Sequence, residues 1–173
     1  MKVVLYIAAS LDGYIAKPGD DLSFLSMVEM PGEDYGYAEF TRTIDKVILG
    51  RKTYDWVMKQ VPVFPHADKE CYVLTRNSKE SIENTHFYSG DIQELVQTLK
   101  AKGGKNIFCD GGAKTANSLL KLGLIDELIL SVIPIILGDG IKLFEEGIPE
   151  RMLKLLSSKS YPSGLVQLHY VLR

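Results

Sequence analysis

The sequence predicts an α/β layer fold whose central sheet is mixed but mostly parallel, with flanking helices and a C-terminal antiparallel hairpin. Short apolar runs alternate with amphipathic stretches along most of the chain, which is typical of helices covering a buried sheet. Near the C-terminus this alternation gives way to two strand-like runs in succession. With 173 residues, 46% of them hydrophobic, the chain can bury a core without a metal or a disulfide. We expect a single domain over residues 1–173.

Six short apolar runs predict strands that are buried on both faces. They are residues 3–9, 46–49, 71–75, 86–88, 106–109 and 128–134. The final hairpin is predicted from residues 152–161 and 165–173, which flank the turn residues Pro162-Ser163-Gly164. An antiparallel hairpin makes the sheet mixed, which argues against a purely parallel dinucleotide-binding domain.

Amphipathic stretches predict helices at residues 35–43, 53–59, 92–102 and 113–122. The third has the strongest pattern, because one face of it collects Ile92, Leu95, Val96 and Leu99. Asp91 is placed to cap the start of this helix, and Gly103-Gly104 is placed to end it.

Composition and charge exclude several classes of function. The formal charge is −2, without the cationic excess that binding to a phosphate backbone requires, so we expect no nucleic-acid partner. The first apolar run reaches polar residues too soon for a signal peptide or a membrane span. Cys71 and Cys109 form no Cys-x-x-Cys pair and the three histidines lack metal-ligand spacing, so we expect a cytoplasmic protein without a metal.

Glycines and small polar residues directly follow three of the predicted strands, at the place where open α/β sheets bind ligands. Two of these segments also open a helix, where backbone N–H groups and the helix dipole favour an anion. The segments are Gly50-Arg51-Lys52-Thr53, Asp110-Gly111-Gly112-Ala113-Lys114-Thr115 and Thr75-Arg76-Asn77, the last of which follows Leu74, itself a candidate for cofactor binding. Each one alone is also explained by an ordinary turn or a solvated first helical turn. Together they predict a cradle for an elongated ligand with several phosphates.

A fourth segment, residues 10–25, places acidic residues before an apolar stretch. Asp20 or Asp21 can cap a helix there, which is the usual role of an Asp in this position. Alternatively, a carboxylate among Leu22, Phe24 and Leu25 could hold a polar ring.

In this order, the segments resemble the dihydrofolate reductase superfamily, including the reductase domain of the bifunctional riboflavin-biosynthesis deaminase-reductase. Gly50-Arg51-Lys52-Thr53 resembles the Gly-Arg-x-Thr motif that holds NADPH phosphates in that superfamily. Asp110-Gly111-Gly112 resembles its paired glycines, which are joined by a non-proline cis peptide. The resemblance implies a three-layer fold and NADPH as the cofactor. It further implies that Thr75 and Arg76 contact the adenosine 2′-phosphate, and that Ala8 and Ile15 offer backbone groups to the carboxamide.

The resemblance also implies a reaction, the transfer of a hydride from NADPH to a C=N bond of a pterin-like or aminopyrimidine substrate. The substrate would be like that of dihydrofolate reductase or of 5-amino-6-(5-phosphoribosylamino)uracil reductase. Asp21 is the implied catalytic acid, with Asp110 as the second candidate, and Leu22, Leu25 and Val57 are implied to contact the substrate. A homodimer is expected. The alternatives are a domain that binds NADP without catalysis, acting as a sensor or an assembly module, and a purely structural domain.

Overall fold

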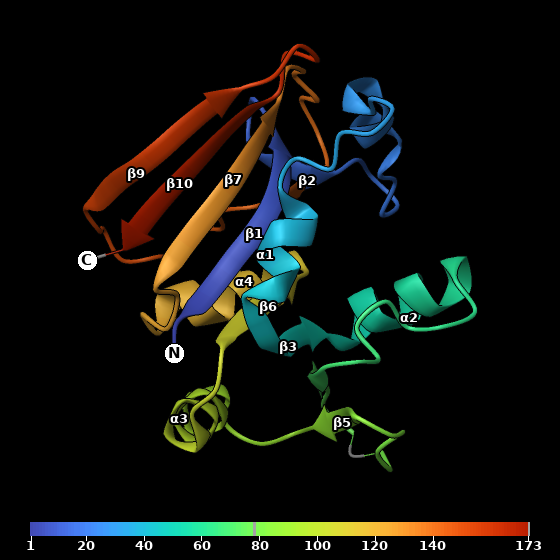
Figure 1. Cartoon of the computed structure of the whole chain (residues 1–173), viewed down its shortest axis with the longest axis vertical. Helices are drawn as coiled ribbons and strands as arrows, with labels where there is room; N and C mark the ends of the chain where they lie inside the picture. Colours follow the sequence, from blue (N-terminus) through green and yellow to red (C-terminus); the bar gives the residue numbers. More distant parts are fainter. Residues whose placement is uncertain (78, 173) are drawn as a thin grey trace.

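The computed structural model describes residues 1–77 and 79–172 and shows a three-layer α/β fold around an eight-stranded sheet (Figure 1). The strand order is β5-β4-β3-β6-β1-β7-β10-β9. The first six strands in this order are parallel, whereas β10 and β9 are antiparallel to their neighbours. The sheet is therefore mixed and mostly parallel, as the sequence predicted. Arg173, the last residue of the predicted hairpin, lies outside the described residues.

The strands lie close to the ranges predicted from the apolar runs. Their bounds are β1 (Val3–Ser10), β3 (Ile44–Gly50), β4 (Glu70–Leu74), β5 (Thr85–Tyr88), β6 (Asn106–Gly111), β7 (Glu127–Ile133), β9 (Leu153–Ser160) and β10 (Val166–Leu172). The central strands are almost wholly buried, because helices cover both faces of the sheet.

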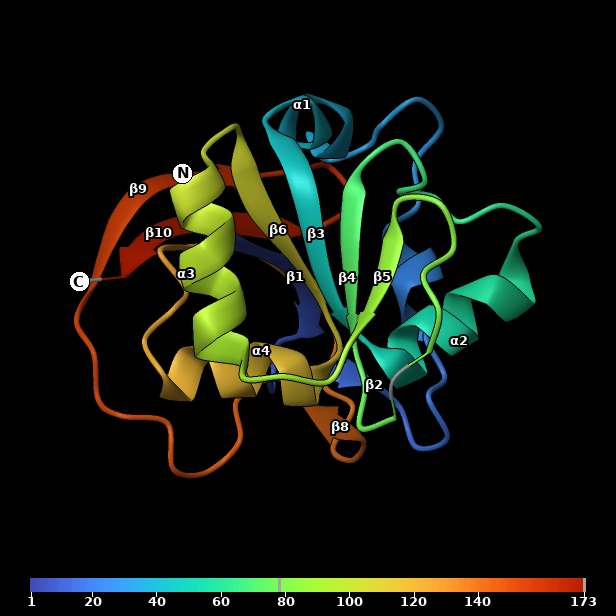
Figure 2. The ribbon, with the colours of Figure 1, turned by 90° about the horizontal axis from the view of Figure 1, so that it is seen from below.

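Helices cover both faces of the sheet (Figure 2). On one face, α1 (Tyr37–Arg42) and α2 (Arg51–Gln60) bury Phe40 and Tyr54 against the sheet. On the other face, α3 (Ile92–Lys102) and α4 (Ala113–Lys121) bury Leu99 and Leu119. No helix in the described part of the chain is long and apolar enough to cross a membrane.

Helix α3 confirms the predicted cap and stop. The Asp91 carboxylate accepts hydrogen bonds from the backbone N–H groups of Gln93, at 2.8 Å, and Glu94, at 2.9 Å. Gly103 ends the helix with a φ of 73°, a left-handed conformation that costs glycine little. The predicted apolar face is the buried one.

Several elements differ from the prediction. Helix α1 starts at Tyr37 rather than at residue 35, because Tyr35 and Gly36 have positive φ angles. Helix α2 starts at Arg51, two residues earlier than predicted. The acidic segment leads into a short 3₁₀ helix, η1 (Ser23–Val28). A small second sheet, β2 (Tyr14–Ala16) with β8 (Ile141–Lys142), was not predicted, because strands of two or three residues show no periodicity.

The C-terminal hairpin extends the sheet beyond the helices (Figure 1). Its turn closes with a hydrogen bond from the Gly164 N–H to the Tyr161 carbonyl oxygen at 2.9 Å. Tyr170 and Leu172 of β10 pack against the main core, whereas every residue of the edge strand β9 is exposed.

Candidate functional site

Four parallel strands end side by side at one edge of the sheet, in the order β4, β3, β6 and β1. Neighbouring strands are about 4.8 Å apart, so the four ends span about 14 Å. The segments singled out in the sequence follow β4, β3 and β6, and Ala8 lies near the end of β1. The fold therefore brings the predicted cofactor segments into one continuous row.

The centre of this row is a crevice between the ends of β3 and β6. The chain leaves β3 into α2 on one face of the sheet and leaves β6 into α4 on the other face. Such a switch in direction is where open α/β sheets bind ligands. The two helix starts touch, because the Gly112 N–H donates a hydrogen bond to Thr53 Oγ1 at 2.8 Å. A Cβ added to Gly50 would lie 2.9 Å from Thr115 Oγ1.

The peptide bond between Gly111 and Gly112 is cis, as the resemblance implied. Gly111 has a φ of 89°, a conformation that favours glycine. The paired glycines end β6 and lead directly into α4, so their backbone forms part of the crevice wall.

The helix starts at the crevice have no caps of their own. Neither α2 nor α4 has a side-chain cap hydrogen bond, and neither has an acidic residue in its first turn. Helix α3, which follows β5, has both. The free N–H groups and the exposed ammonium groups of Lys52 and Lys114 leave this site positively polarised, which suits a pyrophosphate.

Two arginines flank the crevice, one paired with a carboxylate and the other exposed to solvent. The Arg51 Nε donates to both oxygens of Asp55, at 2.7 and 2.8 Å, and its guanidinium lies 5.4 Å from the centre of the Phe87 ring. Arg76 is exposed after Leu74, the last residue of β4. The Thr75 hydroxyl donates to the Asn77 carbonyl oxygen at 3.1 Å, which is the turn that the sequence offered as the alternative.

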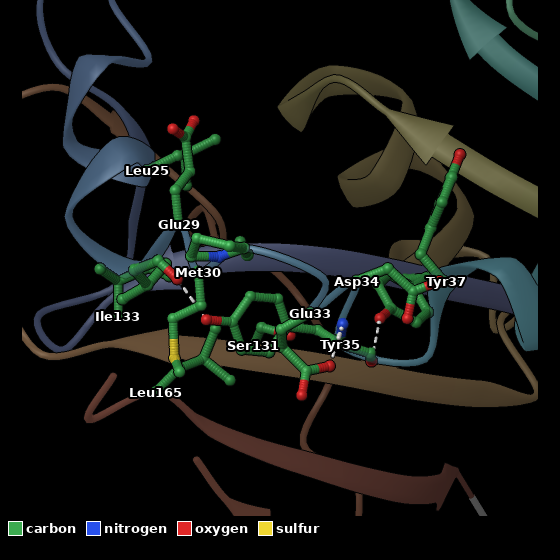
Figure 3. Close-up of a pocket in the computed structure, with 14 residues that line it drawn as sticks. Leu25, Glu29, Met30, Glu33, Asp34, Tyr35, Tyr37, Ser131, Ile133 and Leu165 are labelled. Carbon is green, nitrogen blue, oxygen red and sulfur yellow. Dashed lines mark hydrogen bonds between the residues drawn. The ribbon is translucent and has the colours of Figure 1, made fainter. Parts of the chain in front are cut away.

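A cavity of about 740 Å³ opens over the ends of β1 and β7, next to this row (Figure 3). It includes Ala8 and Leu25, both named from the sequence. Its other lining residues are Tyr6, Val28, Glu29, Met30, Pro31, Glu33, Asp34, Tyr35, Tyr37, Ser131, Ile133 and Leu165. This size and mostly apolar lining suit a small organic ring system.

The polar groups of the cavity floor bond to one another. The Tyr6 hydroxyl donates to the Tyr35 carbonyl oxygen at 2.9 Å, and Gln167 Nε2 donates to the Tyr6 and Ser131 hydroxyl oxygens at 3.0 and 3.1 Å. Burial raises the pKa of Tyr6 to about 12. Burial, together with the negative charge of Asp110, also raises the pKa of Tyr37 well above its usual value. Both phenols therefore stay neutral hydrogen-bonding groups at physiological pH.

The two acids named from the sequence lie in different places. Asp21 is exposed and lies outside the cavity lining, and its carboxylate accepts hydrogen bonds from the Ser23 N–H at 2.7 Å and the Ser23 hydroxyl at 3.1 Å. These bonds hold the pKa of Asp21 below its usual value. Asp110 is partly buried at the end of β6, with its Oδ2 at 3.4 Å from Nε2 of the buried His66.

The remaining sequence candidates lie around these features. Ile15 lies on β2 and packs against the main core. Val57 lies on α2 and packs against the core between this helix and the sheet. Leu22 immediately precedes η1. Sequence reasoning did not find the cavity's acidic and aromatic residues between positions 29 and 37. The signal that could have found them is the mixture of acidic and tyrosine residues in that short segment.

The mixed sheet, the crevice at the switch point and the cis diglycine define the dihydrofolate reductase-like class of α/β proteins. The chain belongs to the RibD C-terminal domain family, whose sequence profile matches residues 27–167. It is 45% identical to the uncharacterized protein YwjB of Bacillus subtilis over 172 residues, which is 98% of this chain and 97% of YwjB.

Solved structures show the same fold. A protein of Shewanella sp. PV-4 assigned to riboflavin biosynthesis has a TM-score of 0.91 and 30% identity, covering 100% of this chain and 99% of that one. The dihydrofolate reductase of Enterococcus faecalis, complexed with NADP(H) and RAB-propyl, has a TM-score of 0.67 and 17% identity, covering 99% and 96%. The latter similarity shows the fold alone.

Proposed function

We propose that this protein is an NADPH-dependent reductase that acts on a C=N bond of a small heterocycle, pterin-like or aminopyrimidine. The row of four strand ends carries the proposal, because it offers uncapped helix starts at its centre and a ring-sized cavity at one end. Family membership and the NADP(H) complex of the Enterococcus reductase support the choice of cofactor.

We assign the residues along the row to successive parts of this cofactor. The backbone N–H groups that start α2 and α4, with Thr53, Lys52 and Lys114, would hold the pyrophosphate. At the β4 end, Thr75 and Arg76 would hold the 2′-phosphate. At the β1 end, backbone groups of Ala8 and Ile15 would hold the carboxamide, which directs the nicotinamide toward the cavity.

NADPH supplies a hydride when bound, and the chain's own residues orient the substrate and exclude water. Reduction of C=N adds the hydride to carbon and a proton to nitrogen, which gives CH–NH. We propose Asp110, beside His66, as the group closest to the cofactor row for handling this proton. Asp21 precedes η1, whose Leu25 and Val28 line the cavity, and would act from outside that lining.

Arg76→Ala tests the cofactor assignment. The variant should bind NADPH about tenfold or more weakly while its affinity for NADH stays nearly unchanged, because only NADPH carries the 2′-phosphate. Isothermal titration calorimetry with both nucleotides measures the two affinities.

Arg42→Ala is the matched control, because Arg42 ends α1 just before β3 starts, at the opposite edge of the sheet. It should leave both affinities unchanged. Equal losses for NADPH and NADH in Arg76→Ala would remove the 2′-phosphate contact from the proposal, and no heat with either nucleotide in the wild type would remove the cofactor itself.

We also propose that the protein is a homodimer that forms through the β9 edge. Leu153, Leu155 and Leu156 on this strand are 41–48% exposed, and an exposed apolar edge strand favours pairing with another chain.

Cys71 and Cys109 are free and buried, which suits a reducing cytoplasm.

A further inference from the structure

The cavity carries charge of one sign. Among the described residues that line it, the charged side chains are Glu29, Glu33 and Asp34, and no Lys, Arg or His is present. The neighbouring row of strand ends, proposed above to bind the cofactor, carries Arg51, Lys52, Arg76 and Lys114. The proposed active site is therefore divided into a basic part for the cofactor and an acidic part for the substrate.

Backbone contacts hold two of these carboxylates in place. Asp34 accepts hydrogen bonds from the N–H groups of Gly36 and Ala38, each at 2.9 Å, and these bonds hold the pKa of Asp34 below its usual value. Glu33 accepts a hydrogen bond from the Tyr35 N–H at 2.7 Å. Figure 3 shows Glu29 beside Leu25 at one end of the cavity and Asp34 at the other. Negative charge is thus spread along the whole opening.

The walls between these acids are aromatic and apolar. The Tyr6 and Tyr37 rings meet edge to face, with their centres 5.6 Å apart, and the Ser131 hydroxyl lies in the floor. Leu25, Ile133 and other apolar side chains complete the lining. A flat ring can stack in such a cavity while its amino groups reach carboxylates at the opening.

We infer that this cavity selects an amino-substituted aromatic heterocycle, neutral or cationic, that carries no phosphate and no carboxylate. The inference rests on the proposed reductase function and specifies its substrate class. Amino groups donate to the carboxylates in charge-assisted hydrogen bonds, whereas an anionic group would face like charges without a cation to pair with. A phosphoribosyl pyrimidine and a substrate with a glutamate tail are both disfavoured on this basis.

Cytidine and cytidine 5′-monophosphate are matched probes, because both are aminopyrimidines and only the second carries a phosphate. With NADP⁺ in saturating amount, amide NMR signals of cavity residues such as Tyr6 and Ser131 report binding at this site. Cytidine should bind about tenfold more tightly than its monophosphate at low salt, and the gap should narrow at high salt as screening increases. Equal or tighter binding of the monophosphate, or no binding of either probe at millimolar concentration, overturns the inference.

The double substitution Glu29→Gln with Glu33→Gln tests the source of the preference. It should reduce the cytidine preference about fivefold, while the amide oxygen introduced at position 33 can still accept the Tyr35 N–H. Glu146→Gln with Glu150→Gln is the control, because both residues are exposed outside the cavity lining and the formal charge changes equally. An unchanged preference in the cavity variant, or an equal change in the control, overturns the assignment to these acids.

Failure of the cofactor proposal would be distinguishable from failure of this inference. If calorimetry detects no NADPH or NADP⁺ binding, the reductase proposal fails. The affinities of cytidine and cytidine 5′-monophosphate can then be compared without cofactor, from the same amide NMR signals. That comparison still decides whether the cavity selects against anions.

Discussion

Asp12 joins two loops that are distant in the sequence. Its carboxylate accepts hydrogen bonds from the Ser10 hydroxyl at 2.6 Å and from the N–H groups of Leu137 and Gly138 at 3.0 and 2.7 Å. The Ser10 hydroxyl, followed by these backbone groups, lowers the pKa of Asp12 from 3.8 to about 2. The loop after β1 is thereby fixed to the loop after β7, close to Ala8.

This contact predicts a pH-dependent contribution to stability. Because the pKa in the folded state is lower than in the unfolded state, the stabilisation is full above the unfolded value of 3.8 and is lost as the pH falls toward about 2. Asp12→Asn should therefore lower the urea midpoint at pH 7, and the difference from wild type should shrink between pH 4 and pH 2. Urea unfolding at several pH values measures it.

The exposed Glu150→Gln serves as a control and should leave the midpoint unchanged across the same range. A difference between Asp12→Asn and wild type that stays constant down to pH 2 would show that the Asp12 charge does not hold the loops.

At the scale of single residues, the segments proposed for the cofactor carry a clearer sequence signal than the cavity residues proposed for the substrate. Glycines and cations directly after apolar strands are visible in the sequence, and the fold puts them in one row. The cavity's acids come from the loop before α1, which has no regular periodicity, and Tyr37 is the first residue of α1.

At the scale of elements, the contrast between capped and uncapped helices has a measurable consequence. An acidic residue in the first turn of a helix stabilises it by about 0.3–1 kcal/mol, and the same charge repels a phosphate. Lys114→Glu should therefore leave the free protein equally stable or slightly more stable, yet weaken NADPH binding about tenfold or more. Urea unfolding without ligand and calorimetry with NADPH give the two results.

Asp91→Ala is the converse change, on the capped helix α3. It should lower stability by about 1 kcal/mol through loss of the α3 cap and leave NADPH affinity unchanged. If Lys114→Glu destabilised the free protein and bound NADPH normally, the start of α4 would be an ordinary helix terminus and not a phosphate site.

At the scale of the whole molecule, β9 is the exposed edge of the sheet, and Figure 1 shows it at the far side from the α2 helix. If the homodimer forms there, Leu155→Lys should give a folded monomer, because a buried ammonium at the interface is costly. Sedimentation velocity measures the mass, and circular dichroism checks folding.

Leu122→Lys is a matched control, because Leu122 is 47% exposed and Leu155 is 48% exposed, while Leu122 lies at the end of α4. It should remain dimeric. A wild-type protein that sediments as a monomer at the same concentration would contradict the proposed dimer.

The sequence by itself determined the elements whose signals are local. Buried strands, the capped helix α3 and the hairpin turn at Gly164 follow from apolar runs, a capping Asp and turn residues, which act within a few positions of the chain. The tertiary structure decided which distant segments meet, including the order β4, β3, β6 and β1 and the bond between Thr53 and Gly112. It also decided that the acids of the loop before α1 face a cavity, because strand order and loop packing depend on contacts between residues far apart in the chain.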